Sequence, residues 1–393
     1  MLAVLLLGFS SGLPLLLVGG TLKLWMKDVG VDLTVIGIFS LVGLPYTLKF
    51  LWSPLMDRYA PPFLGRRRGW ILIWQVALTI AILFLATRDP LASAWSVAAA
   101  AFLVAWCSAS QDIAIDAYRR DVLTDAELGL GSALAINGYR VGMLVSGALA
   151  AALADQIPWR LVYFVMAAGI AIGVAATLLA PNPERSAVPP ASMREAIVNP
   201  FRDYFGRRGA LEILVFILLF KIGDSMASEM TNPFYLDLGF TKTTIGMVAK
   251  LFGFWAAIAG GLLGGIIMLR LGINRSLWVF GLLQSCSILG FSFLARVGDS
   301  VPVLAAVVTL EVLTSGMGTA AYVAFMASLC NLKYSATQYA LLTSLMGIPR
   351  VIFGASAGYL AKHLGWEGYF LFCALITIPG LLMLTRIAPW KRK

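Results

Sequence analysis

The chain has 393 residues, of which 60% are apolar and only 13% are charged. Soluble domains usually hold about 45 to 50% apolar and about 25% charged residues, so this composition excludes a chain built from long water-soluble domains. The formal net charge of +10 comes from short basic clusters between apolar runs. Membrane topology explains such clusters better than a nucleic-acid-binding face does, and no nucleic-acid partner is expected.

Apolar runs long enough to span a bilayer recur along the whole chain. A spanning helix needs about 20 apolar residues and tolerates some tilt. The runs lie at about residues 1–22, 33–55, 70–87, 93–118, 130–154, 160–180, 209–230, 243–268, 276–295, 301–328, 338–361 and 368–388. The sequence therefore predicts an all-α membrane protein with twelve transmembrane helices. The first run has no basic n-region and no cleavage site, so we expect a retained span and no signal peptide.

Basic residues in the connections predict the orientation. If the N-terminus is cytoplasmic, the inner connections and the C-terminal tail hold more than twice as many Lys and Arg residues as the outer connections. Cytoplasmic loops carry this excess, so both termini are expected inside. The longest polar stretch, PNPERSAVPPASMREAIVNPFRDYFGRRG, separates the sixth and seventh runs. Its middle, 193–205, mixes apolar and basic residues and is expected to lie on the inner membrane surface.

The two halves of the chain show weak sequence similarity at an offset of about 210 residues, as parallel repeats in transporters do. Arg140 in the fifth run falls opposite Arg350 in the eleventh, and WRLVYF after the fifth run resembles WEGYF after the eleventh. The predicted organisation is an N-terminal six-helix bundle at 1–180, a cytoplasmic linker at 181–208 and a C-terminal six-helix bundle at 209–393 with a short basic tail.

Two aspartates lie one helical turn apart in the fourth run. Asp112 and Asp116 in SQDIAIDAYRRD are four residues apart and share a helix face. Repulsion and desolvation favour protonation of one of them, which makes both proton-coupling candidates. Neutralisation by Arg119, Arg120 or Arg140 as a purely structural ion pair is an equal alternative.

Other ionisable residues inside the spans are expected to face a polar cavity or one another, because each costs about 2.5 to 3.5 kcal/mol at a helix centre. Lys221 and Asp224 in FKIGDSM can pair along one helix. Asp224 is a further proton-coupling candidate, and we favour Arg140, Lys221, Asp224 and Arg350 over Lys49, Lys250, Glu229 and Glu311 for substrate or coupling. The full set of predicted substrate-binding residues is Arg140, Lys221, Lys250, Arg350, Lys49, Tyr46, Gln111, Asn137, Tyr139 and Gln338.

The connection MDRYAPPFLGRRRGW resembles, in degenerate form, the cytoplasmic latch of the major facilitator superfamily. It places Asp57 and Arg58 at one helix end and three arginines, Arg66, Arg67 and Arg68, at the start of the next. Arg270 and Arg275 form its shorter counterpart in the second half. We predict a gating role for these residues, with a simple positive-inside cluster as the alternative.

Enzymatic and metal chemistry find no support in the sequence. The four cysteines have neither CxxC nor His-linked spacing, and no GxxxxGK[ST] motif is present. No nucleophile, base and orienting group occur together. We expect no enzyme activity, no metal site and no cofactor.

At these residues the sequence closely resembles the AmpG muropeptide permease family, a branch of the major facilitator superfamily. Matching segments run through both halves, and SPLMDRYAPPFLGRRRGW and SASQDIAIDA are the specific ones. The resemblance implies a fold of two pseudo-symmetric six-helix bundles in the bacterial inner membrane. It also implies proton-coupled import of GlcNAc-1,6-anhydroMurNAc and its muropeptides by alternating access, driven by the proton gradient. Such import serves peptidoglycan recycling and, where an inducible β-lactamase exists, its induction and hence antibiotic resistance.

Two alternative functions stay open on the sequence alone. The chain is also compatible with a carrier of acetyl-CoA or another anionic metabolite, because the eukaryotic acetyl-CoA transporters resemble this family around SATQYALL. A receptor that binds muropeptide without moving it is the alternative from another class. The expected partners are the muropeptide substrate, protons and the lipid bilayer, and a monomer is expected.

Overall fold

The structure is a computed structural model that describes residues 1–31, 35, 39–183, 189–207, 209–346 and 348–390. Side chains at 40, 242–243, 249–251 and 348–356 also lie outside the described part. The chain forms two compact units, each described by itself below. Unit 1 comprises residues 1–124, 134–202 and 330–344, and unit 2 comprises residues 125–133, 203–329 and 345–393. The division expected at 181–208 stays a prediction.

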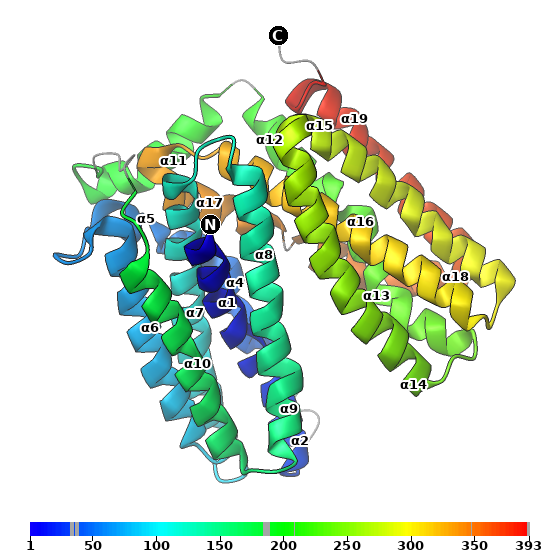
Figure 1. The fold of residues 1–393 in the computed structure, drawn as a ribbon, viewed down its shortest axis with the longest axis horizontal. Helices are drawn as coiled ribbons and strands as arrows, with labels where there is room; N and C mark the ends of the chain where they lie inside the picture. The colour runs from blue at the N-terminus through cyan, green and yellow to red at the C-terminus, as the bar shows by residue number, and fades with distance from the viewer. Residues whose placement is uncertain (32–34, 36–38, 184–188, 208, 347, 391–393) are drawn as a thin grey trace. The chain divides into compact units, whose positions relative to one another are not determined.

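The first half of the chain folds mainly into long helices (Figure 1). The elements are α1 (Leu2–Leu17), α2 (Gly20–Asp28), η1 (Phe39–Gly43), α4 (Leu44–Leu48), η2 (Lys49–Leu51), α5 (Ser53–Arg58), α6 (Gly65–Ala86), α7 (Ala94–Val122), α8 (Leu128–Leu144), η3 (Val145–Leu149), α9 (Ala150–Ala154), α10 (Trp159–Leu179) and α11 (Met193–Phe205). The run expected at 33–55 is broken into short pieces, because Pro45 and Pro54 begin new helical turns.

The second half is also helical where it is described. Its elements are α12 (Ala210–Phe220), α13 (Ile222–Asp237), α14 (Lys242–Ile245), η4 (Gly246–Phe252), α15 (Gly253–Val297), α16 (Val301–Ser328), η5 (Leu332–Tyr334), α17 (Ser335–Met346), α18 (Ile348–Leu375) and α19 (Ile378–Ile387). Both α15 and α18 are two helices joined at a sharp turn, at Gly272 (φ 75°) and Gly365 (φ 66°). Glycine suits both turns, because a side chain would be strained at positive φ.

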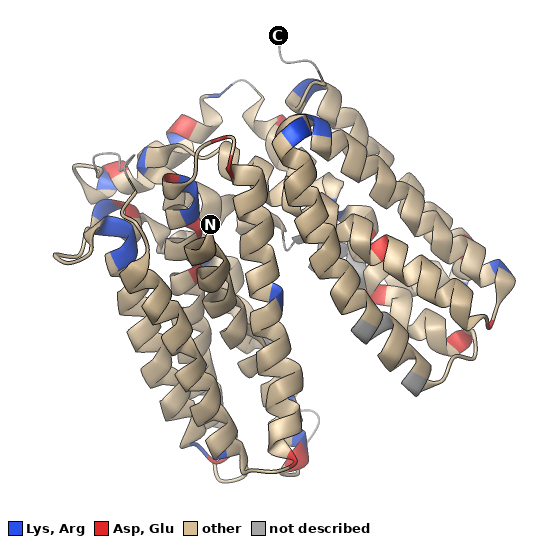
Figure 2. Ribbon diagram, in the orientation of Figure 1, with Lys and Arg blue, Asp and Glu red and all other residues tan. Residues whose placement is uncertain are grey.

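Eight helical segments of the described chain are long and apolar enough to cross a membrane. They are Leu2–Asp28, Gly65–Ala86, Ala94–Val122, Leu128–Ala154, Trp159–Leu179, Gly246–Val297, Val301–Ser328 and Ala357–Ile387. The segment at 246–297 holds two of the predicted runs, and the run at 209–230 is interrupted at Lys221. Figure 2 shows most charged residues near the ends of the helices, as bilayer-spanning helices require.

Close helix contacts hold unit 1 together at small residues. A Cβ added at Gly138 of α8 would lie 2.0 Å from the carbonyl oxygen of Leu5, and one added at Gly12 of α1 would lie 2.0 Å from that of Tyr139. The backbones of α1 and α8 therefore touch directly, in the manner of small-residue helix pairs in membranes. The apolar core of unit 1 includes Ala336 and Ala340 of α17 beside Met56 and Ala117.

Candidate functional site

Three arginines open α6 in unit 1 because of a turn that precedes them. Leu64 (φ 55°) and Gly65 (φ 75°) both have positive φ, and the helix begins at once with Arg66, Arg67 and Arg68. A helix N-terminus carries partial positive charge, so three cations there repel both the helix and one another. Nearby carboxylates are therefore required to compensate the positive charge of these three arginines.

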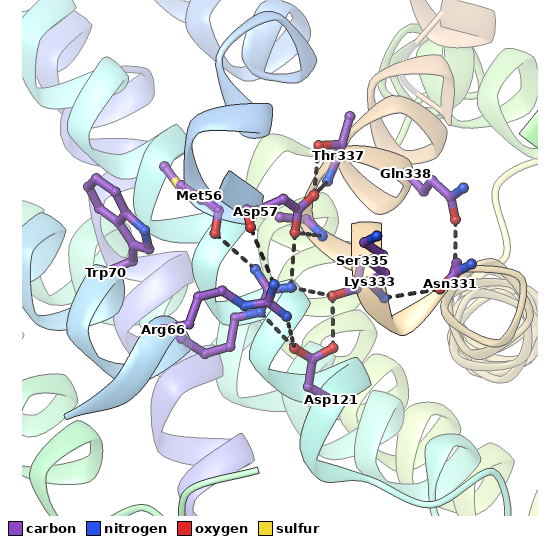
Figure 3. A network of polar contacts seen from close by, with 12 residues as sticks. Met56, Asp57, Arg66, Trp70, Asp121, Asn331, Lys333, Ser335, Thr337 and Gln338 are labelled. Carbon is purple, nitrogen blue, oxygen red and sulfur yellow. Dashed lines mark hydrogen bonds and ion pairs between the residues drawn. The ribbon is translucent and has the colours of Figure 1, made fainter. Parts of the chain in front are cut away.

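Asp57 of α5 and Asp121 of α7, both labelled in Figure 3, balance the charge of Arg67. Its Nη2 donates to Asp57 Oδ1 of α5 at 2.9 Å, and its Nε donates to Asp121 Oδ2 of α7 at 2.6 Å. The three side chains are almost fully buried, with exposed fractions of 1% or less. A buried guanidinium between two carboxylates is a strongly held arrangement, because removal of any member leaves an uncompensated charge.

Asp57 also binds the beginning of α17. Its Oδ2 accepts from the backbone N–H of Thr337 at 2.8 Å and from Thr337 Oγ1 at 2.7 Å, and its Oδ1 accepts from the N–H of Ala336 at 3.3 Å. The negative charge thus meets the unpaired donors of a helix N-terminus. Ser335 Oγ donates to Asp121 Oδ1 at 2.7 Å and completes the network. We call Asp57, Arg67, Asp121, Ser335 and Thr337 the latch cluster.

The other predicted gating residues lie outside the latch cluster or at its edge. Arg66 Nη1 donates to the carbonyl of Asp57 at 3.3 Å. Arg68 instead donates to the carbonyls of Thr177 and Leu178, which end α10. Arg58 packs against the ring of Tyr59.

In unit 2, Arg270 and Arg275 flank the turn at Gly272, and both are exposed. Arg275 Nε donates to the carbonyl of Trp390 near the C-terminus at 3.2 Å. The structure therefore brings Arg66 and Arg67 to Asp57, whereas Arg275 of the shorter counterpart bonds to the backbone of Trp390, after α19.

Helix α11 is attached to the segment at 330–344. Lys333 Nζ donates to Glu195 Oε1 at 2.8 Å, and Gln338 Nε2 donates to the carbonyl of Pro200 at 3.1 Å. Gln338 Oε1 accepts from the backbone N–H of Asn331. The pKa of Glu195 lies below its ordinary value because of the hydrogen bond from Lys333, and the same bond raises the pKa of Lys333. Gln338, predicted to bind substrate, thus uses both ends of its amide in this attachment.

The two aspartates of α7 have different surroundings. Asp116 accepts from Arg119 Nη2 at 3.0 Å and has Lys49 Nζ at 3.9 Å. Asp112, which is 9% exposed, accepts from Ser11 Oγ at 2.5 Å, and Lys49 is within electrostatic range of it. Asp116 is therefore directly paired with two cations, whereas the direct partner of Asp112 is a hydroxyl.

Several predicted substrate-binding residues gather around Asp112 in unit 1. Tyr46 and Tyr139 lie within electrostatic range of its carboxylate. Asn137 is buried, and its amide has no hydrogen-bond partner in the described part of the chain. Arg140 follows Tyr139 on α8 and is half-buried.

Gln111 has a different environment. Its Nε2 donates to the carbonyl of Ser10 at 3.0 Å, and its Oε1 accepts from Ser10 Oγ at 3.3 Å. These two hydrogen bonds connect α7 to α1. They occupy both the nitrogen and the oxygen of the Gln111 amide, so fewer of its hydrogen-bonding positions are available to a ligand.

In unit 2, Lys221 and Asp224 pair as the spacing predicts. Lys221 Nζ donates to Asp224 Oδ2 at 2.9 Å, and the side chains are only 9% and 18% exposed. Lys221 lies at the interruption between α12 and α13, where the backbone leaves helical geometry (φ −103°, ψ 4°). Ion sites in transporters often lie at such interruptions, because the free backbone groups add polar partners. The side chains of Lys250 and Arg350 lie outside the described residues.

Sequence reasoning missed three members of the latch cluster. Asp121 is an acid directly after two arginines, and Ser335 and Thr337 stand where an apolar run begins after Asn331. Ser and Thr at that place are a helix-start signal. The signal locates the N-terminus of a helix, but it does not say which distant carboxylate will bind there.

Comparisons with known proteins agree with this fold. The sequence profile described as Major Facilitator Superfamily matches residues 2–354 and, in a second alignment, 234–392. The anhydromuropeptide permease of Escherichia coli (strain K12) is 46% identical over 383 residues, which are 97% of this chain and 78% of that protein. A putative transporter AmpG 4 of Rickettsia conorii is 36% identical over 97% of this chain and 94% of its own length.

Solved structures of low sequence identity share the fold. The fucose:proton symporter of E. coli has a TM-score of 0.75 at 11% identity, over 100% of this chain and 98% of that one. The proton:xylose symporter XylE has a TM-score of 0.73 at 10% identity, over 99% and 95%. These comparisons confirm the predicted major facilitator fold. The chain belongs to the Major Facilitator Superfamily and, within it, to the AmpG family of muropeptide permeases.

Proposed function

We propose that this membrane transporter is a proton-coupled importer of GlcNAc-1,6-anhydroMurNAc and its muropeptides, from the periplasm to the cytoplasm across the bacterial inner membrane. The observation that carries the proposal is the 46% identity to an anhydromuropeptide permease over 97% of this chain. Import would serve peptidoglycan recycling and, in a host with an inducible β-lactamase, its induction. The proposed form is a monomer with both termini in the cytoplasm.

The chemistry of the described polar residues supports an anionic, sugar-containing substrate. Muropeptides carry carboxylates and many hydroxyl and amide groups, so their binding requires cations and hydrogen-bonding side chains inside the spans. Lys49 and Lys221 are buried cations within the apolar runs. Tyr46, Asn137 and Tyr139 add hydroxyl and amide groups near Asp112. Each is a proposed substrate contact, together with Arg140.

Asp112 is the proposed proton carrier in unit 1, in preference to Asp116. A buried carboxylate without a directly bound cation is costly to keep ionised, and protonation removes that cost. Asp116 has Arg119 and Lys49 to balance its charge. Protonation of Asp112 would bias the inward and outward populations of the alternating-access cycle.

The latch cluster is the proposed gate on the cytoplasmic side. Its hydrogen bonds attach the beginning of α17, which follows unit 2 in sequence, to helices α5, α6 and α7 of unit 1. A conformational change that moves 330–344 away from these helices must break those bonds. The cluster therefore favours the attached state and sets a barrier to the other one.

Uptake into proteoliposomes tests this proposal. The purified full chain should accumulate labelled GlcNAc-1,6-anhydroMurNAc-peptide when an inward proton gradient is imposed, and should only equilibrate it without the gradient. Labelled acetyl-CoA serves as the competing substrate. Accumulation of acetyl-CoA alone would refute the muropeptide assignment, and muropeptide binding without counterflow would identify a receptor.

A further inference from the structure

Unit 2 contains a buried carboxyl that the proposed function does not use. Glu311 of α16 is 9% exposed. Ser315 lies one turn later on the same face of α16, and its Oγ donates to Asp224 Oδ1 of α13 at 3.1 Å. The carboxyl of Glu311 lies within electrostatic range of Asp224 and Lys221. Two acids from different helices thus meet beside the ammonium of Lys221.

The one cation that the described chain places beside the two buried carboxyls determines the charge state of the group. The ammonium of Lys221 balances one carboxylate, so a second ionised carboxylate would carry an uncompensated charge away from water, which is costly. Ionisation of both would place two negative charges beside one ammonium among apolar neighbours such as Ile222, Met226 and Val308. Close carboxyl pairs share one proton for this reason.

The helices packed around the pair contribute few other charges in the described part of the chain. From α15 the nearby polar side chains are the neutral Gln284 and Ser287, and Ser287 bonds to Thr314 of α16. Lys250 is on η4, which packs against α16, and its side chain lies outside the described part. The titratable groups described at the start of α13 and along it are Lys221, Asp224, Glu229, Tyr235 and Asp237, and those of α18 that contact α13 include Tyr369 and Cys373. Lys221 is the cation of this group, and its ammonium is bonded to Asp224.

We propose that Asp224 and Glu311 share one proton, with Lys221 as their counter-ion, and that the pair is a second proton-binding site of the transport cycle besides Asp112. The proposal rests on the proposed proton-coupled import. A substrate carboxylate that binds Lys221 takes the counter-ion from Asp224, so substrate binding and proton binding favour each other. This linkage is reciprocal, as any coupling between two binding equilibria must be.

Infrared spectroscopy of the full chain in nanodiscs tests the shared proton directly. We expect wild-type protein at neutral pH to show a carbonyl band of a protonated carboxyl that disappears in Glu311→Gln. The same band should disappear in Asp224→Asn, because Glu311 then pairs with Lys221 and ionises. Glu212→Gln, a matched change at an exposed carboxyl, should leave the band intact. A band that survives both Glu311→Gln and Asp224→Asn overturns the proposal, and Asp224→Asn keeps the test valid if Glu311→Gln fails to fold.

Transport measurements test the role of the proton. Glutamine matches protonated glutamate in size and charge but cannot release a proton, so Glu311→Gln should retain counterflow. Under a gradient of one pH unit, each coupled proton supports about tenfold accumulation, so loss of one proton should lower the accumulation ratio about tenfold. A wild-type protein that accumulates muropeptide, together with an unchanged ratio in Glu311→Gln, overturns this inference alone. A wild type that accumulates nothing refutes the proposed function instead. Loss of counterflow with an unchanged infrared band would make Glu311 structural and also overturn the inference.

Discussion

The substitution Asp57→Asn should release the start of α17 from unit 1. Asp57 accepts four hydrogen bonds, from Arg67 Nη2, the N–H groups of Ala336 and Thr337, and Thr337 Oγ1. Asparagine keeps one accepting oxygen and turns an NH₂ group toward the remaining donors. Arg67 then relies on Asp121 alone for charge compensation.

The expected cost follows from the burial of the pair. Removing one partner of a buried ion pair costs about 3 to 5 kcal/mol, and each buried donor left without a partner costs about 1 to 3 kcal/mol. Asp57→Asn breaks the ion pair with Arg67 or leaves the donors of α17 unpaired, so we expect a loss of about 3 to 5 kcal/mol. Since 1.4 kcal/mol is a factor of ten, local opening of 330–344 should become about 10² to 4 × 10³ times more frequent.

Amide hydrogen exchange of the full chain in nanodiscs measures this opening. The amides of Ala336 and Thr337 should exchange faster by that factor, whereas amides in the middle of α10 should keep their wild-type rates. Glu212→Gln is the control, because its pair with Arg386 is 3.8 Å long and largely exposed, and such pairs contribute at most about 1 kcal/mol. Exchange at 336 and 337 equal to that of wild type would refute the reasoning that Asp57 holds this helix.

Three further predictions follow from the other contacts. Gly138→Ala should lower the free energy of unfolding by about 1 to 3 kcal/mol, because its Cβ would lie 2.0 Å from the Leu5 carbonyl oxygen. Gly20→Ala, whose Cβ would have its nearest described neighbour at 4.0 Å, should show no such loss in the same thermal unfolding assay. Asp112→Asn should abolish proton-driven uptake in proteoliposomes while the protein still inserts in the membrane, and undiminished accumulation would remove Asp112 from its proposed role. The attachment of α11 should depend on pH, because the pKa of Glu195 is lowered and that of Lys333 is raised by their hydrogen bond. Their contribution should be complete between the ordinary pKa values of about 4.3 and 10.4, and should disappear as pH falls through the lowered pKa of Glu195 or rises through the raised pKa of Lys333. Hydrogen exchange of the α11 amides at several pH values, corrected for the intrinsic exchange rate, checks this dependence. In Glu195→Gln, the protection of these amides should no longer decrease as the pH falls.

Local pairs were predictable from spacing alone. Lys221 and Asp224 are three residues apart, and α13 begins directly after Lys221, so the first turn of that helix brings the two side chains together. The pairing of Asp116 with Arg119 follows from the same spacing. The opposite surroundings of Asp112 and Asp116 were not predictable, because the cation near Asp116 and the hydroxyl on Asp112 come from Lys49 and Ser11, on other helices.

The amino-acid sequence by itself determined that this protein is a helical membrane protein, because apolar length and the placement of Lys and Arg act within single segments. Its motifs determined the transporter family, through their resemblance to that family. Only the tertiary structure decided which helix end Asp57 binds and which carboxyl meets Asp224. Those contacts join residues 87 or more positions apart, and such pairings depend on how the helices pack, a choice that no local periodicity in the sequence encodes.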